Sequence, residues 1–331
     1  MNFTTPIELP KKEFGITHKN RIMLVGSCFA SNIGSRLEER KFNIEINPFG
    51  VLYNPLSIAA MLKRIVAKEP FGAESLELFE HNGQWHSILH HSDFSRNNKE
   101  ELIEYLNARI EKAHNTAKNC DAIFITFGTA YTYTLNNTGT IAGNCHKLPG
   151  KMFTRRLLGI KEIVDTISEI ITLYKSYNNN IKFIFTVSPI RHLRDGAHDN
   201  QKSKSTLLLA IDEIMQQHPD NTLYFPAYEI LLDELRDYRY YADDLVHPSN
   251  MAVEYIWECF GKCFFNEETT AVCNDIEEIV RGLNHRPFNA TSEGYKNFIN
   301  NLLKKIEVCK KLHPYLDLEK EIKQCNTLLK K

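Results

Sequence analysis

Short apolar runs alternate with helical patterns over the first two thirds of the chain, and this alternation constrains the fold more than any other feature. The runs are rich in β-branched and aromatic residues and cover 21–25, 42–46, 121–126 and 181–187, with a fifth candidate at 222–225. Helical patterns cover 29–41, 55–67, 99–117, 160–177 and 204–217. Strands separated by helices predict a mostly parallel sheet with helices on both faces, a flavodoxin-like three-layer α/β/α fold.

The pattern changes toward the C-terminus, where helices follow one another without a strand. Helical spacing is found at 255–264, 275–283, 292–312 and 316–329. We therefore expect an α/β domain over residues 1–265 and a C-terminal helical extension over residues 266–331 that packs on the same domain. The segment 81–96 is too short for a further strand and helix, so it is expected to form an inserted hairpin or loop.

Charge and composition exclude several classes of protein. Lys and Arg together number 40 against 41 Asp and Glu, so no excess of positive charge is available for nucleic acid or an anionic membrane. No window approaches the roughly 20 apolar residues that cross a bilayer, and the N-terminus lacks the apolar core of a secretory signal. We expect a cytoplasmic protein with no membrane insertion and no nucleic-acid partner.

The cysteine and histidine spacing argues against metals and disulfides. The eight cysteines are scattered without a C-x-x-C pair, which favours reduced thiols. Cys145 and His146, like His90 and His91, are adjacent pairs without the separated ligands of a zinc site. The prediction includes no metal and no cofactor.

A Gly26-Ser27-Cys28 sequence stands where the first predicted strand passes into the first predicted helix. Ligands of open parallel sheets bind at the carboxyl ends of the strands, so the Ser27 hydroxyl is expected to face a substrate crevice. The helix start would also stabilise a developing oxyanion, as an acyl-transfer nucleophile requires. The alternative is that Ser27 only caps the helix. Cys28 is a conceivable thiol nucleophile, but it is expected to pack inward as a small hydrophobic residue.

An Asp244-x-x-His247 sequence occurs late in the chain, just before a helical pattern. An Asp three residues before a His can place both side chains on one side of a tight turn, where the carboxylate orients the imidazole. The other ring nitrogen is then free for a serine. The alternative is a capping Asp beside a surface His.

Together with further motifs, these two sequences resemble the GSCFA domain family, which is itself similar to the SGNH or GDSL-like hydrolases. The resemblance covers about residues 20 to 290. The motifs that carry it are VGSCFASNIG (25–34), NPFGVLYNPLSI (47–58), ITFGTAYTY (125–133), AGNCHKLPG (142–150), SPIRHLRDGAHDNQKSKS (188–205), DDLVHPS (243–249) and HRPF (285–288).

The resemblance implies a role for each of four residues. Ser27 would be the nucleophile, His247 the general base and then acid, and Asp244 the carboxylate that orients His247. Gly50 would match the glycine of the oxyanion hole. The pattern departs at Gly128-Thr129, where SGNH enzymes carry an asparagine that completes the oxyanion hole.

Other polar residues are candidates for the missing donor or for substrate binding. Thr129 and Asn144 are candidate oxyanion donors, and His146 lies in the same polar segment as Asn144. Arg191 and His192 follow the fourth predicted strand and could bind an anionic or hydroxylated substrate. The alternatives are a polar loop without a ligand and an arginine that pairs with an acidic neighbour.

These features predict a serine esterase of SGNH type that acts on a small-molecule or carbohydrate ester, such as an O-acetyl ester, through an acyl-enzyme. An O-acyltransferase with the same triad shares the first half-reaction, so the sequence leaves it open. A non-catalytic module that binds a glycan or acylated ligand is a second alternative, and an assembly component that uses the charged C-terminal helices is a third.

Overall fold

Five parallel strands form the central sheet of the computed structural model, which describes residues 4–10, 14–289 and 291–330. They are β1 (Arg21–Gly26), β2 (Asn43–Ile46), β5 (Ala122–Phe127), β8 (Lys182–Val187) and β9 (Thr222–Tyr224). Their spatial order is β2-β1-β5-β8-β9. Counted along the chain, this is the flavodoxin-like order 2-1-3-4-5. The predicted parallel sheet is confirmed.

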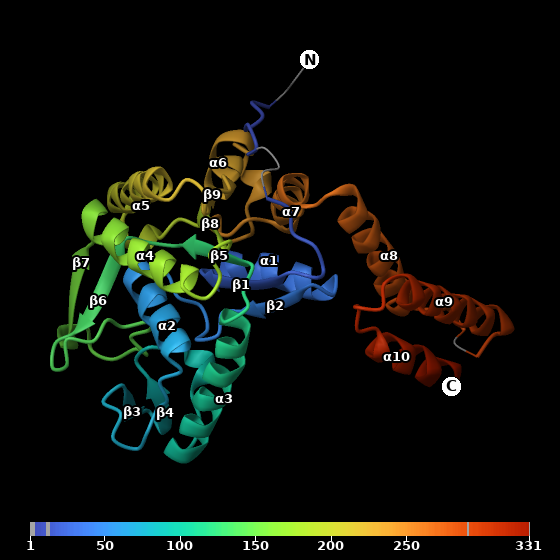
Figure 1. Ribbon diagram of the computed structural model, residues 1–331, viewed down its shortest axis with the longest axis horizontal. Helices are drawn as coiled ribbons and strands as arrows, with labels where there is room; N and C mark the ends of the chain where they lie inside the picture. The colour runs from blue at the N-terminus through green and yellow to red at the C-terminus, as the bar shows by residue number, and fades with distance from the viewer. Residues whose placement is uncertain (1–3, 11–13, 290, 331) are drawn as a thin grey trace.

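Helices cover both faces of the sheet, as the strand patterns require (Figure 1). Alternate residues of a strand point to opposite faces, so Met23 of β1 packs in one core and Leu24 in the other. The first core includes side chains of α2 (Pro55–Ala67), α3 (Lys99–Ala117), α4 (Ile160–Lys175) and α5 (Ala197–Gln217). The second includes side chains of α1 (Cys28–Glu39) and α7 (Asn250–Phe264). The three-layer α/β/α architecture is therefore confirmed.

Polar side chains fix where several of these helices begin. Asn54 caps α2 by accepting a hydrogen bond from the Ser57 amide at 2.9 Å, and Pro55 fits the first helical position. Asn98 caps α3 in the same way through the Glu101 amide at 2.7 Å. Such caps satisfy amides that have no partner within the helix.

Two hairpins stand outside the central sheet. The hairpin predicted at 81–96 is present, formed by β3 (Leu78–His81) and β4 (Gln84–Ser87), and it begins three residues earlier than expected. A second hairpin pairs β6 (Tyr131–Leu135) with β7 (Phe153–Leu157) and was not predicted from the sequence. Short helical segments lie at Ser92–Phe94, Gly150–Met152, Leu193–Asp195, Ala227–Glu229 (α6), Ile230–Glu234 and Tyr238–Tyr240.

The last three helices share a hydrophobic cluster of their own. They are α8 (Glu267–Leu283), α9 (Glu293–Leu312) and α10 (Glu319–Leu329) (Figure 1). Ion pairs link them to the end of α1, between Arg40 and Glu277 and between Lys41 and Glu321. The predicted boundary at residue 265 falls between α7 and α8, and the division into two domains stays a prediction. No helix in the described ranges is both long and apolar enough to span a membrane.

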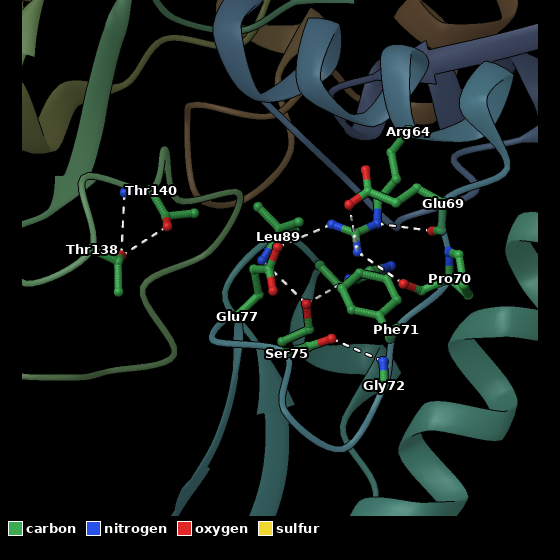
Figure 2. Close-up of polar contacts among 12 residues, drawn as sticks. Arg64, Glu69, Pro70, Phe71, Gly72, Ser75, Glu77, Leu89, Thr138 and Thr140 are labelled. Atoms are coloured by element: carbon green, nitrogen blue, oxygen red, sulfur yellow. Dashed lines mark hydrogen bonds and ion pairs between the residues drawn. The ribbon is translucent and has the colours of Figure 1, made fainter.

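Arg64 of α2 organises the loop that leads into the first hairpin (Figure 2). Its side chain is nearly buried and donates to the carbonyl oxygens of Glu69 at 3.1 Å and Pro70 at 3.3 Å, and to the Glu77 carboxylate at 3.1 Å. The guanidinium also lies 3.8 Å from the centre of the Phe71 ring. A single side chain thus satisfies two loop carbonyls and one acidic group.

We expect Arg64→Met to lower the free energy of unfolding by about 2 kcal/mol, because it leaves two partly buried carbonyl oxygens and the Glu77 carboxylate without their partner. Urea unfolding followed by circular dichroism measures the change. Lys63→Met is the matched control, since Lys63 pairs with Glu169 on the surface and such pairs contribute less than about 1 kcal/mol. Equal effects of the two substitutions would contradict the assigned role of Arg64.

Candidate active site

The carboxyl ends of β1 and β5 form the point where the strand order reverses, which is where open α/β sheets bind their ligands. Gly26 ends β1 with a φ of +127°, and a Cβ atom there would lie 2.1 Å from the Thr126 carbonyl oxygen. The Ser27 amide then donates to that same oxygen at 3.1 Å. Only glycine allows the two strands to approach this closely just before α1 begins.

Ser27 does not face an open crevice. Its side chain is the N-cap of α1, with the hydroxyl oxygen 3.3 Å from the Phe29 amide, and the residue is 1% exposed. The capping interaction of the alternative reading is thus present, and the role of Ser27 as nucleophile stays a prediction. Cys28, expected to be packed inward, is instead partly exposed at the first position of α1.

Asp244 and His247 form the predicted pair. The Asp244 Oδ2 atom lies 2.6 Å from His247 Nδ1, and Oδ1 accepts from the amides of Val246 and His247 at 2.9 Å each. Leu245 has a φ of +57° in this tight turn, a conformation that costs energy for a residue other than glycine. The predicted contact between Asp244 and His247 is present, and the catalytic role of the pair stays a prediction.

Hydrogen bonds keep the Asp244 carboxylate ionised. The His247 amide, the Val246 amide and the His247 ring lower the pKa of Asp244 to about 2. With Nδ1 directed at a carboxylate, Nε2 of this half-exposed ring is the nitrogen left for a reacting group. Within the ranges that the structure describes, no hydrogen bond joins the His247 ring to the Ser27 hydroxyl, so the complete triad stays a prediction.

His192, which follows β8, lies near Gly128 at the end of β5. A Cβ atom on Gly128, just after β5, would lie 3.4 Å from His192 Nε2, and the His192 ring meets Tyr53 edge-on at 5.5 Å. Burial, the charge of Lys204 and that of His247 lower the pKa of His192 to about 4, although Asp195 acts in the opposite direction. His192 is thus a neutral imidazole near pH 7.

Lys204 is a part of the site that the sequence analysis missed. It is 0% exposed, and its ammonium donates to the carbonyl oxygens of Gly128 and Ser188 at 2.7 Å each. Burial lowers the pKa of Lys204 to about 7, while the neighbouring Cys28 raises it. The sequence carried one signal for this burial. Lys204 stands three residues before Leu207 and seven before Ile211, which places it on the apolar side of α5.

Gly50 and Thr129, two predicted oxyanion donors, make structural hydrogen bonds. The Gly50 amide donates to the Asn47 carbonyl oxygen at 2.7 Å within its turn. The Thr129 hydroxyl lies 3.0 Å from the Ser203 hydroxyl and accepts from the Tyr131 amide at 3.1 Å. The Gly50 amide is therefore already engaged in this structure, and the catalytic roles of both residues stay predictions.

Asn144 and His146 belong to a separate group of side chains beside the first hairpin. The Asn144 side chain accepts from the His146 amide at 2.8 Å, and the His146 ring lies 2.9 Å from the Ser87 carbonyl oxygen and 4.7 Å from the His86 ring. Burial lowers the pKa of His146 to about 4. These contacts support the polar-loop alternative, and no contact joins either residue to Ser27 or His247 in the described part of the chain.

Arg191 lies in a cavity of about 460 Å³ beside the Asp244–His247 turn. Leu245 and Val246 of that turn contribute to the cavity, together with Arg236 and Tyr241. Among the described residues Arg191 forms no ion pair, although Asp237 lines the same cavity, so the alternative of an arginine paired with an acidic neighbour is not supported. The described ranges contain no cluster of side chains suited to hold a metal ion.

Comparison with known proteins supports the resemblance in the sequence. The model of the GSCFA family matches residues 21–260, and that of the GSCFA domain protein, C-terminal domain, matches residues 276–331. The search of curated proteins gave no match. The first match covers well over half of the chain, from β1 through most of α7, and includes both sequence elements of the site. The chain belongs to the GSCFA family.

Proposed function

We propose that this protein is an acyl hydrolase of SGNH type that cleaves an ester through an acyl-enzyme formed at the start of α1. The observation that carries the proposal is the 2.6 Å hydrogen bond between Asp244 and His247, which leaves Nε2 as a general base. His247 also lies close enough to His192, which follows β8, to affect the pKa of that residue, and ligands of such a sheet bind at the carboxyl ends of its strands.

In the proposed reaction, His247 Nε2 takes a proton from the nucleophile as it attacks the ester carbonyl carbon. His247 then gives that proton to the leaving alcohol, and the acyl group stays on the enzyme. Water completes the second half-reaction, with His247 again as the base. The ionised Asp244 stabilises the imidazolium that forms in each half, and its low pKa keeps it ionised at any pH above about 3.

The cavity beside the Asp244–His247 turn is the proposed binding site for part of the substrate. Its arginines, Arg191 and Arg236, suit a hydroxylated or anionic group such as an acylated carbohydrate. An acceptor alcohol bound there in place of water would make the protein an O-acyltransferase.

The test is turnover of p-nitrophenyl acetate and butyrate and of acetylated sugars, each with and without added sugar acceptors. Hydrolysis that exceeds the buffer rate, and that His247→Ala abolishes while the variant remains folded, is the expected result. Acyl transfer that requires an acceptor would favour the transferase. Binding of an acylated sugar without turnover of any ester would contradict the proposal and favour a non-catalytic binding module.

A further inference from the structure

Two exposed arginines, Arg191 and Arg236, line the cavity beside the Asp244–His247 turn. Within the described part of the chain, neither side chain forms a hydrogen bond or an ion pair. Asp237 lines the same cavity, but its carboxylate accepts from the Arg239 amide at 2.9 Å and lies 3.5 Å from Arg239 Nε. The described residues thus give the cavity two positive charges against one negative charge that another arginine already engages.

Backbone hydrogen bonds join the wall of this cavity to the proposed base. Tyr241 lines the cavity, and the next residue, Ala242, donates its amide to the His247 carbonyl oxygen at 2.8 Å. Val246 lines the cavity as well, and its amide donates to Asp244 Oδ1 at 2.9 Å. A group that occupies the cavity therefore lies next to the turn that carries the proposed base.

The size and the apolar walls of the cavity suit a small ring. Its volume of about 460 Å³ falls in the range of small-molecule sites, roughly 300 to 1,000 Å³. Tyr238 and Tyr241 both contribute to it, with ring centres 6.1 Å apart, and Leu193 and Leu245 add aliphatic surface. Such side chains can pack against the carbon skeleton of a ring while a guanidinium group binds a charged substituent.

We propose that this cavity recognises an anionic group of the substrate, so that the preferred ester is an acylated sugar acid or an acylated sugar phosphate. The inference rests on the proposed function for the ester and on Arg191 and Arg236 for the anion. Guanidinium groups bind carboxylate and phosphate alike through paired N–H···O hydrogen bonds. A neutral sugar lacks the negative charge that strengthens these bonds and is expected to bind more weakly.

Direct binding tests the inference without any turnover. Isothermal titration calorimetry of the wild type compares glucuronate, glucose 6-phosphate and glucose at one ionic strength. At least one of the anionic sugars is expected to bind about tenfold more tightly than glucose, because hydrogen bonds between two charged groups are the stronger kind. The tighter of the two anions shows whether the natural group is a carboxylate or a phosphate. Equal affinities for all three sugars would overturn the inference.

Substitution of single arginines tests the location of the site. Arg191→Gln and Arg236→Gln keep a polar side chain and remove the charge, so each is expected to weaken binding of the preferred anion by about tenfold. Arg194→Gln is the matched control, because Arg194 is an exposed arginine on the same loop as Arg191 and does not line the cavity. If Arg194→Gln weakened binding as much as Arg191→Gln, the attraction would be one of general charge and the inference would fail.

Kinetics separate this inference from the proposed function. Acetate release is measured from the acetylated forms of glucose and of the anionic sugar that binds more tightly. The kcat/KM for the anionic ester is expected to be at least about tenfold higher, and Arg191→Gln should bring the ratio of the two values close to one. Equal kcat/KM values in the wild type would overturn the inference and leave the proposed function intact. Anion binding that depends on Arg191, without turnover of either ester, would contradict the proposed function and support the anion site.

Discussion

Replacing His247 with alanine is expected to lower kcat/KM for ester hydrolysis by about 10³- to 10⁴-fold, and Asp244→Asn by about 10²-fold or more. In the proposed reaction, His247 supplies the base in both half-reactions. Asp244 holds the ring by a 2.6 Å hydrogen bond and fixes the turn through two backbone amides. Steady-state kinetics on a p-nitrophenyl ester measures both losses.

Asp243→Asn is the matched control for this prediction. Asp243 is the neighbouring exposed carboxylate, and the described structure gives it no hydrogen bond or ion pair. The substitution removes the same charge from the same turn, so activity within about twofold of the wild type is expected. If Asp243→Asn and Asp244→Asn reduced kcat/KM equally, the effect would be one of local charge, and the orienting role of Asp244 would be refuted.

A pH-dependent stability difference is the second large expected effect. The pKa of Lys204 falls from 10.5 to about 7 on folding. Between these two pH values Lys204 is protonated in the unfolded chain and has lost its proton in the folded protein. The free energy of unfolding therefore rises with pH in this window. The free energy of unfolding of the wild type, relative to that of Lys204→Met, should therefore rise by about 2 kcal/mol between pH 7 and pH 9. The slope behind this figure is about 1.4 kcal/mol per pH unit for one proton.

Urea unfolding of both proteins at intervals from pH 6 to pH 9 measures this gain. The difference between wild type and variant removes the contribution of every other titrating group that the two share. Below pH 7 the difference should level off, because Lys204 is then protonated in both states. A difference that stays constant across the whole range would show that Lys204 keeps its ordinary pKa in the folded protein.

The central sheet and the order of its strands and helices could be predicted from the sequence, because each strand is a compact apolar run between amphipathic helices. Helix starts were less predictable. The helix α5 begins at Ala197, seven residues before the expected 204, because its first two turns are polar and carry little hydrophobic periodicity. The hairpin of β6 and β7 was missed because its two strands are short and separated by a long loop.

The candidate site was predictable only where its geometry is local. Asp244 and His247 are three residues apart, so their contact follows from one turn. Ser27 and Cys28 are adjacent, and adjacent residues at this turn point in different directions. Sequence periodicity does not resolve a difference of one residue, so it cannot decide which of the two faces the substrate. Lys204 was overlooked because it lies in a run of polar residues, and its burial comes from packing between α5 and the ends of β5 and β8.

The most direct test of covalent acyl transfer at the start of α1 is mass spectrometry of the protein quenched with acid during turnover of p-nitrophenyl acetate. One acetyl group is expected on the tryptic peptide 22–36, which contains both Ser27 and Cys28, with fragment ions that assign it to one of these two residues. The Cys145 peptide serves as the control for incidental acetylation. Turnover of the ester with peptide 22–36 unmodified, or acetylated no more than the Cys145 peptide, would contradict the account.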